Sequence, residues 1–293
     1  MVDYAKISKM IEYQQNGIWP HDKLPREHTL SIKQKLSDIL RILLNRGPVK
    51  STHYNNVVNL PTECFRYGTR AWEYPWVLEV LNQNIKANSK VMDCGCGTNG
   101  FPLVLHQNGY KAMGLDYFVG DDSQKVGYGL TDSYIKKNSS KIEFVNGGME
   151  AIPLSDNMVD AITCISVMEH VVIEHKEKPD FHLQCLKEMN RVLKPGGLLI
   201  CTYDTILNKD VVYADKFGWG KNGWYYKEDI EYLFSLGMKP LVETIIHERE
   251  DILKDENAFF IPPDFYFAYG YGSGFEDYGK YHRLTSVGFA LKK

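Results

Sequence analysis

The stretch MDCGCGTNG, residues 92–100, contains two overlapping glycine patterns that belong to different kinds of ligand site. Read from Gly95, it has the spacing G-x-G-x-x-G, whose glycines allow a tight turn and a close backbone approach to a pyrophosphate. Read from Asp93, it places a carboxylate two residues before a shorter G-x-G pattern. Both patterns connect a strand to a helix, so they predict a similar fold and differ in the ligand.

Short apolar segments alternate with helical segments on the carboxyl side of this loop. The candidate strands are KVMDCG (90–95), KAMGLDY (111–117), KIEFVNG (141–147), DAITCISV (160–167) and GGLLICTYD (196–204). The candidate helices between them are PLVLHQNGY (102–110) and FHLQCLKEMNRVL (181–193). This alternation predicts an α/β fold with a doubly wound, Rossmann-like parallel sheet. Ligands of such sheets bind at the carboxyl ends of the strands.

The remaining segments predict additions to this core. Helical patterns at 31–48 and 72–85, the second with Pro75 near its first turn, predict an N-terminal helical cap or lid over residues 1–87. The core domain would then span 88–293, with insertions at 205–226 and 251–283. Between the insertions lie a candidate helix (227–237) and strand (240–248), and a last candidate strand covers 284–293.

Composition narrows the classes of partner. The net charge is −3 and the basic residues are dispersed, so there is no basic stripe of the kind that binds nucleic acid. No apolar run reaches the roughly 18 residues of a membrane span, and the N-terminus lacks a signal-peptide pattern, so we expect a cytoplasmic protein. The six cysteines include no C-x-x-C pair, which predicts reduced, mostly buried thiols. His170 and His175 are five residues apart and would not share one helix face, so we expect no metal site.

Electrostatics distinguishes the two candidate ligands of the glycine loop. Asp93 would repel the doubly anionic pyrophosphate of a dinucleotide. The same carboxylate would favour the cationic ammonium and sulfonium of S-adenosylmethionine. Asp116, at the end of the second candidate strand, could accept hydrogen bonds from two ribose hydroxyls in either ligand. The charge of Asp93 therefore favours S-adenosylmethionine.

Four ordered motifs carry a resemblance to a known family. They are VMDCGCGTNG (91–100), GLDY (114–117), FVNGGMEAIPLSDNMVDAITCISVMEHV (144–171) and EMNRVLKPGGLLICTYD (188–204). In order and spacing they resemble the class I S-adenosylmethionine-dependent methyltransferases, especially the group related to quinone-biosynthesis methyltransferases. The resemblance covers roughly residues 88–206. It implies a seven-stranded sheet in which the last strand is antiparallel and lies next to the fifth.

The resemblance also implies a set of cofactor-binding residues. Asp93, Gly95 and Gly97 would line the methionine and ribose part of S-adenosylmethionine, and the backbone from Ile165 to Val167 would lie near the methionine end. The resemblance further places Asp116 at the ribose hydroxyls, with Tyr117, Gly148 and Met149 around the adenine ring.

Two positions depart from the family pattern. The third loop glycine of the family falls on Asn99, with Gly100 one place later. Asparagine tolerates unusual backbone angles, so we still expect Asn99 to contribute to the cofactor loop. Gly148 stands where many relatives carry an aspartate that binds the adenine amino group, and a backbone contact or Glu150 could replace it.

Methyl transfer needs mainly an aligned acceptor and the exclusion of water, so little covalent machinery is expected. For a hydroxyl acceptor, His170 is the first candidate for a general base because its unperturbed pKa lies near neutrality. Asp204 and Tyr203, at the end of the fifth candidate strand, are further candidates. An alternative role for His170 is to order the loop after the fourth strand.

Aromatic residues in the two insertions are the candidate acceptor-binding residues. The second insertion contains FYFAYGYGSGFEDYGKY (265–281), and glycine-interleaved tyrosines could stack on a sugar or ring. Tyr269 and Tyr271 would lie on this side of the acceptor, facing Trp219 and Trp224 of the first insertion. We therefore expect a small-molecule or glycan acceptor, methylated on oxygen or nitrogen. The alternatives are a non-catalytic S-adenosylmethionine-binding protein and an NAD-dependent oxidoreductase.

Overall fold

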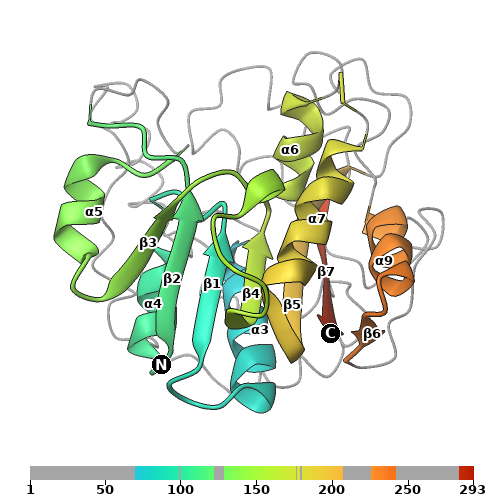
Figure 1. The fold of residues 1–293 in the computed structure, drawn as a ribbon, viewed down its shortest axis with the longest axis horizontal. Coiled ribbons are helices and arrows are strands. Elements are labelled where there is room, and N and C mark those ends of the chain that lie inside the picture. The colour runs from blue at the N-terminus through green and yellow to red at the C-terminus, as the bar shows by residue number, and fades with distance from the viewer. Residues whose placement is uncertain are drawn as a thin grey trace, which may run out of the picture.

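The computed structural model describes residues 70–98, 100–121, 129–175, 177–178, 180–206, 226–241 and 284–293. Its centre is a seven-stranded sheet with the order β3-β2-β1-β4-β5-β7-β6 (Figure 1). The strands are β1 (Lys90–Cys94), β2 (Lys111–Asp116), β3 (Ile142–Asn146), β4 (Val159–Ile165), β5 (Leu193–Ile206), β6 (Lys239–Pro240) and β7 (Leu284–Lys292). Strands β1 to β5 pair with one another in parallel, whereas β7 is antiparallel to both β5 and β6. The predicted α/β fold and the antiparallel last strand beside the fifth are confirmed.

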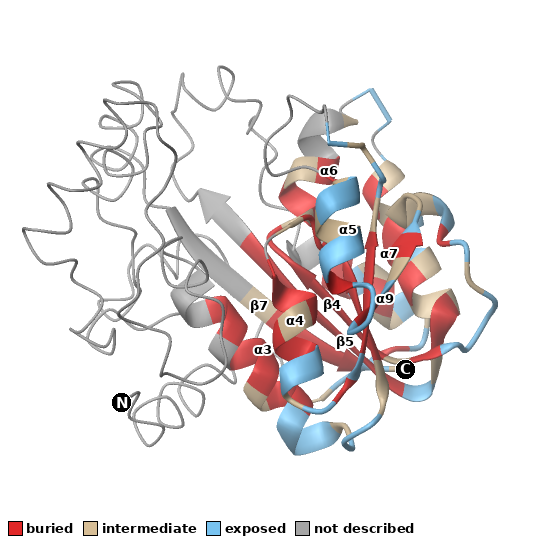
Figure 2. Cartoon of the chain, turned by 90° about the vertical axis from the view of Figure 1, so that its left-hand side faces the viewer, coloured by how far each residue is buried: buried red, intermediate tan, exposed pale blue. Residues whose placement is uncertain are grey.

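Helices cover both faces of the sheet. Those that the structure describes are α3 (Arg70–Asn84), α4 (Phe101–Gln107), α5 (Asp132–Asn138), α6 (Met168–Glu174), α7 (Phe181–Val192) and α9 (Tyr226–Ser235), with a short 3-10 helix η5 (Met149–Ala151). Helices α3 and α4 pack on one face, and α6, α7 and α9 pack on the other. In Figure 2 the strands are buried beneath helices whose outer sides are exposed. Within the described residues, no helix is both long and apolar enough to cross a membrane.

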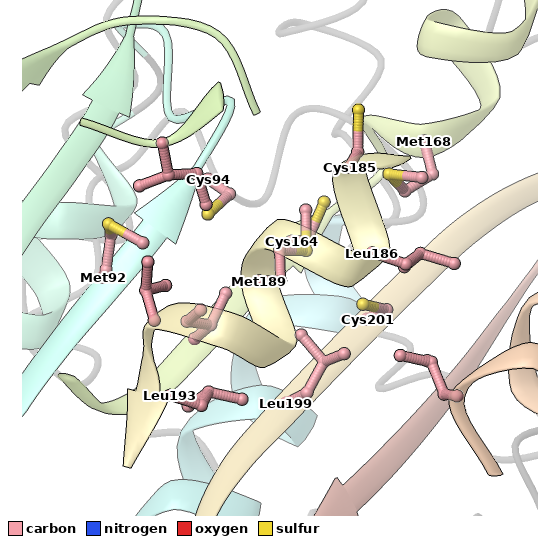
Figure 3. Packing of buried hydrophobic residues seen from close by; sticks show 14 of the residues in the cluster. Met92, Cys94, Cys164, Met168, Cys185, Leu186, Met189, Leu193, Leu199 and Cys201 are labelled. Carbon is pink, nitrogen blue, oxygen red and sulfur yellow. The ribbon is translucent and has the colours of Figure 1, made fainter. Parts of the chain in front are cut away.

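The two faces of the sheet carry two apolar clusters, because side chains of a strand alternate between faces. Val91 of β1 and Ile200 of β5 belong to the cluster beneath α3 and α4. The opposite cluster is rich in sulfur, as Figure 3 shows, and includes Met92, Cys164 and Met189. Full burial of a Val, Leu, Ile or Met side chain contributes about 1.5 to 3 kcal/mol. Because a shift of one residue along a strand would exchange the two faces, this energy fixes which side chains face each helix layer.

Helix α3 differs from the sequence-based expectation in its position. The helix already includes Arg70, before the predicted start at residue 72, so Pro75 lies beyond its first turn. Its residues Trp76, Val77 and Leu81 are buried in the core cluster, which makes α3 a cover of the sheet. Residues 1–69 lie outside the described residues, and the boundary near residue 87 stays a prediction.

Candidate cofactor and active site

The glycine loop adopts backbone angles that side chains disfavour. Gly95, Gly97 and Gly100 have φ values of 69°, 46° and 86°, all in the left-handed region. A Cβ atom on Gly95 would also lie 2.5 Å from Cγ1 of Val167. Glycine at position 95 is therefore required both by its φ angle and by the segment after β4, which packs directly against the loop.

Asp116 joins the glycine loop to the end of β2. Its Oδ2 atom accepts a hydrogen bond of 2.8 Å from the backbone N–H of Gly97. Its Oδ1 atom accepts one of 2.8 Å from the N–H of Tyr117. The carboxylate predicted to bind the ribose hydroxyls thus lies against the loop predicted to bind the same ligand, although the two are 19 residues apart.

Asp93 is buried at the carboxyl end of β1, with 4% of its surface exposed. The hydroxyl of Thr163, its partner in the register of β1 and β4, donates to its Oδ1 atom over 2.7 Å. Burial is the largest cause that raises the pKa values of the neighbouring thiols Cys94 and Cys96, and Asp93 adds to the effect on both. Both thiols are therefore neutral packing groups, and Asp93 is the carboxyl group that lies directly before the loop.

Gly148, Glu150 and Tyr117 meet at the edge predicted to border adenine. The Tyr117 hydroxyl donates to Oε1 of Glu150 over 3.2 Å, and the Tyr117 side chain is 54% exposed. Partial burial and the Glu150 charge raise the pKa of Tyr117. A Cβ atom on Gly148 would collide with the Glu150 carboxylate and the Tyr117 hydroxyl. The glycine thus leaves room for a carboxylate that arrives from residue 150.

Arg191 holds this edge in place from helix α7. Its guanidinium makes paired hydrogen bonds to Glu188, both 2.7 Å long, and a third of 2.7 Å to Asp156. It also donates to the carbonyls of Ile152 and Leu154, each over 2.9 Å. The arginine of the EMNRVLKPGG motif is therefore a structural clamp on the segment after β3.

The turn after β4 contacts a buried acidic residue of helix α3 that the sequence analysis did not identify. Glu73 of α3 is fully buried, and its Oε1 atom accepts hydrogen bonds from the hydroxyls of Ser166 (2.6 Å) and Thr202 (2.5 Å). Ser166 follows Ile165 and has a φ of 47°, which is uncommon for a residue other than glycine. An acidic residue on the apolar face of a helix was the available signal, since Glu73 precedes the buried Trp76 and Val77 by three and four positions.

The three candidate bases lie in different surroundings. His170 is half-buried in the first turn of α6, near the carboxyl end of β4. Tyr203 is buried in the core on the α9 side and donates a hydrogen bond of 2.6 Å to Asp229, an arrangement that suits a structural role. Burial raises the pKa of Tyr203, and the Asp229 charge adds to this effect. Asp204 lies within β5, where its backbone pairs with that of Ser286 in β7.

The other predicted site residues are placed only in part. Met149 opens the 3-10 helix η5 beside Gly148, and Ile165 is buried at the end of β4. The following predicted residues lie outside the described part of the chain: Asn99, Trp219, Trp224, Tyr269 and Tyr271. No group of three or more possible metal ligands occurs among the described residues.

Comparisons with known proteins agree with this geometry. Residues 92–201 match the family model described as a methyltransferase domain. A demethylmenaquinone methyltransferase of Staphylococcus carnosus (strain TM300) is 33% identical over 130 residues, which are 43% of this chain and 48% of that protein. One of Lysinibacillus sphaericus (strain C3-41) is 32% identical over 120 residues, which are 40% of this chain and 45% of that protein. The chain thus spans about half the length of the curated relatives that it matches.

Solved structures share the fold over a longer range. The geranyl diphosphate C-methyltransferase of Streptomyces coelicolor A3(2), solved with S-adenosyl-L-homocysteine, superposes with a TM-score of 0.51 at 13% identity. The match covers 98% of this chain and 97% of that protein, and at this identity it shows the fold alone. Together with the glycine loop, Asp116 and the antiparallel β7, these matches identify residues 92–201 as a class I S-adenosylmethionine-dependent methyltransferase domain, related to those of the quinone-biosynthesis enzymes.

Proposed function

We propose that this chain transfers a methyl group from S-adenosylmethionine to a small-molecule or glycan acceptor, on oxygen or nitrogen. The observation that carries the proposal is the hydrogen bond between Asp116 and the N–H of Gly97, which brings the acidic end of β2 against the glycine loop. The buried carboxyl group of Asp93, directly before the loop, suits a cationic ligand better than an anionic pyrophosphate.

The described residues fit this cofactor along its length. Asp93, the glycine loop and the turn at Ser166 would surround the methionine part, whose ammonium is cationic. Asp116 would accept hydrogen bonds from the ribose hydroxyls in addition to those that it accepts from the N–H groups of Gly97 and Tyr117, since each carboxylate oxygen has two lone pairs. Tyr117 and Glu150 would contact the adenine edge, because Gly148 leaves that space to the Glu150 carboxylate.

The bound cofactor would supply an electrophilic methyl group on a positively charged sulfur, which leaves as a neutral thioether when the acceptor forms its new bond to carbon. The protein must then hold the acceptor in line and exclude water. The half-buried position of His170 near the end of β4 supports a role in taking the proton of a hydroxyl acceptor. Tyr203 and Asp204 remain weaker proposals, and Tyr203 would first have to leave its hydrogen bond to Asp229.

A demethylmenaquinone-like ring is a second candidate acceptor. It is favoured by the names of the curated relatives, which are demethylmenaquinone methyltransferases. Their similarity covers only 40 to 43% of this chain, so it supports the cofactor more than it supports the acceptor. The aromatic residues of the insertions, including Trp219 and Tyr269, favour stacking on a ring or a sugar and are compatible with both acceptors.

Two rival functions make different predictions. A protein that binds S-adenosylmethionine without catalysis would bind the cofactor and never consume it. An NAD-dependent oxidoreductase would bind NADH, against the charge of Asp93 and against the position of the antiparallel β7 between β5 and β6.

Calorimetric titration with S-adenosylmethionine, S-adenosylhomocysteine and NADH tests the cofactor first. We expect binding of the two adenosyl compounds and none of NADH, and the reverse would overturn the proposal. A screen of hydroxyl, amine, glycan and quinone-ring acceptors then follows the mass gain of one methyl group and the formation of S-adenosylhomocysteine. Binding with no turnover on any acceptor class would support the non-catalytic alternative. Methylation of the quinone-ring class alone would support the second candidate.

A further inference from the structure

Glu73 is a fully buried carboxylate that the proposed chemistry does not use. It comes from α3, before the methyltransferase motifs in the sequence. Its partners Ser166 and Thr202 follow it in the chain by 93 and 129 positions. A buried carboxyl group is costly unless it is hydrogen-bonded, so its oxygens need partners. Here one oxygen accepts from two hydroxyls, those of Ser166 and Thr202.

The contacts of Glu73 lead directly to the glycine loop. Ser166 is held at the carboxyl end of β4 by its own N–H, which donates to the carbonyl of Thr202 over 3.0 Å and also contacts the Thr202 hydroxyl at 3.2 Å. The next residue, Val167, packs so closely on Gly95 that a Cβ atom there would lie 2.5 Å from it. A shift of Ser166 would therefore move Val167 against the first glycine of the loop.

We propose that Glu73 is a positioning residue of the cofactor site, which fixes the turn at Ser166 and through it the glycine loop. The inference rests on the proposed function, because it concerns the methionine end of the S-adenosylmethionine site. The left-handed backbone of Ser166 is disfavoured for a non-glycine residue, and the hydrogen bond to Glu73 offsets that cost. Helix α3 thus completes a site whose recognisable motifs all lie after residue 90.

A purely structural role for Glu73 predicts something different. Glu73 would then only attach α3 to the sheet, and its loss would lower the thermal stability without changing the affinity for the cofactor. The chain offers a matched control for this case at the other end of the same helix. The buried Tyr110 donates a hydrogen bond of 2.9 Å to Asn82 of α3, far along the helix from Glu73.

The experiment measures S-adenosylhomocysteine affinity by calorimetry and the unfolding midpoint without ligand, for wild type, Glu73→Ala, Glu73→Gln and Tyr110→Phe. Loss of a buried hydrogen-bonded group should weaken binding about tenfold or more in Glu73→Ala. Glu73→Gln keeps an acceptor oxygen for both hydroxyls, so its affinity should stay within about threefold of wild type. Tyr110→Phe should lower the midpoint and leave the affinity unchanged.

Equal affinity of Glu73→Ala and wild type would overturn the inference, as would an equal loss in Tyr110→Phe. If Glu73→Ala does not fold, Ser166→Ala removes the same link while leaving α3 intact. It should weaken binding about fivefold or more, since one buried hydrogen bond is lost, and unchanged affinity would again overturn the inference. Absence of binding by the wild-type chain would instead count against the proposed function.

Discussion

The carboxylate of Asp116 and the backbone N–H of Gly97 are joined by a hydrogen bond of 2.8 Å. The side chain that we expect to bind ribose therefore also orders the glycine loop before any ligand arrives. A ligand hydroxyl that donates to the same carboxylate would meet an acceptor that is already oriented, which lowers the cost of ordering on binding.

Asp116→Ala should therefore abolish two contributions at once, the ribose contact and the loop contact. We expect S-adenosylhomocysteine to bind about 10- to 100-fold more weakly, because hydrogen bonds to charged groups contribute about 1.5 to 3 kcal/mol. Calorimetry checks the loss. Asp132→Ala, which removes an exposed carboxylate in the first turn of α5, is the matched control and should bind as wild type does. Unchanged affinity of Asp116→Ala would place the ribose elsewhere.

We expect Glu150 to make the adenine contact that the family resemblance assigns to an aspartate at the place of Gly148. Glu150→Ala should weaken binding of the adenosyl compound by about three- to tenfold, since one hydrogen bond to a charged group is lost. It should also reduce the preference for S-adenosylhomocysteine over its inosine analogue, in which the adenine amino group is replaced by an oxygen. An unchanged preference in the calorimetric titrations would show that Glu150 does not recognise the base.

Gly148→Asp provides a reciprocal test of the same edge. Its side chain would collide with the Glu150 carboxylate, so Gly148→Asp alone should bind more weakly than wild type. The double variant Gly148→Asp with Glu150→Ala should recover affinity, because the new carboxylate then has room. If the loss of binding free energy in the double variant equals the sum of the losses in the two single variants, the two positions are independent.

The parallel core could be predicted from the sequence because its signals are local. The core strands were recognisable as apolar runs next to a glycine or an acidic residue. Asp93 and Asp116, for example, lie at the ends of β1 and β2. Helix α5 was missed because Tyr134 and Ile135 are its only large apolar residues, too few for a helical stripe. Its start was nevertheless marked by Thr131, whose hydroxyl accepts from the N–H of Tyr134 over 3.3 Å.

The role of Glu73 could not be predicted, since its partners come from two distant strands. Nothing near residue 73 indicates that Ser166 and Thr202 will supply hydroxyl donors, and the pairing appears only after β4 and β5 lie side by side. The clamp by Arg191 was hidden for a similar reason, because three of its acceptors belong to the segment 152–156. Sequence motifs located the glycine loop that we expect to bind the cofactor, but the support of this loop depends on tertiary contacts.

Arg191→Met should destabilise the domain by removing this clamp. The change removes the paired donor of Glu188 and the guanidinium donor of the Leu154 carbonyl, whereas the Ile152 carbonyl keeps the N–H of Leu154. We expect a loss of about 2 to 3 kcal/mol in the free energy of unfolding. Urea unfolding followed by circular dichroism checks the value. Lys187→Met, an exposed change on the same helix α7, should stay within about 0.5 kcal/mol of wild type. A loss in Arg191→Met no larger than in this control would contradict the clamp.

Acid should remove the stabilisation that Glu188 contributes. Hydrogen bonds from Arg191 lower the pKa of Glu188 in the folded chain, although partial burial acts in the opposite direction. A carboxyl with a lowered folded pKa stabilises the protein fully above its unfolded pKa, near 4.3, and loses that effect as the pH falls through the folded pKa. We therefore expect the free energy of unfolding to decline from about pH 5 downwards, more steeply in wild type than in Glu188→Gln.

Asp160 provides an independent test of the acid response. Despite the opposing effect of burial, hydrogen bonds from Lys194 and the N–H of Lys90 lower the pKa of Asp160. Asp160→Asn should therefore also flatten the decline of stability below about pH 5. Because Asp160 and Glu188 contact different partners, the two changes should act additively in the double variant. Urea midpoints measured from pH 3 to pH 7 give all four slopes, and an unchanged slope in the double variant would mean that other carboxylates govern acid unfolding.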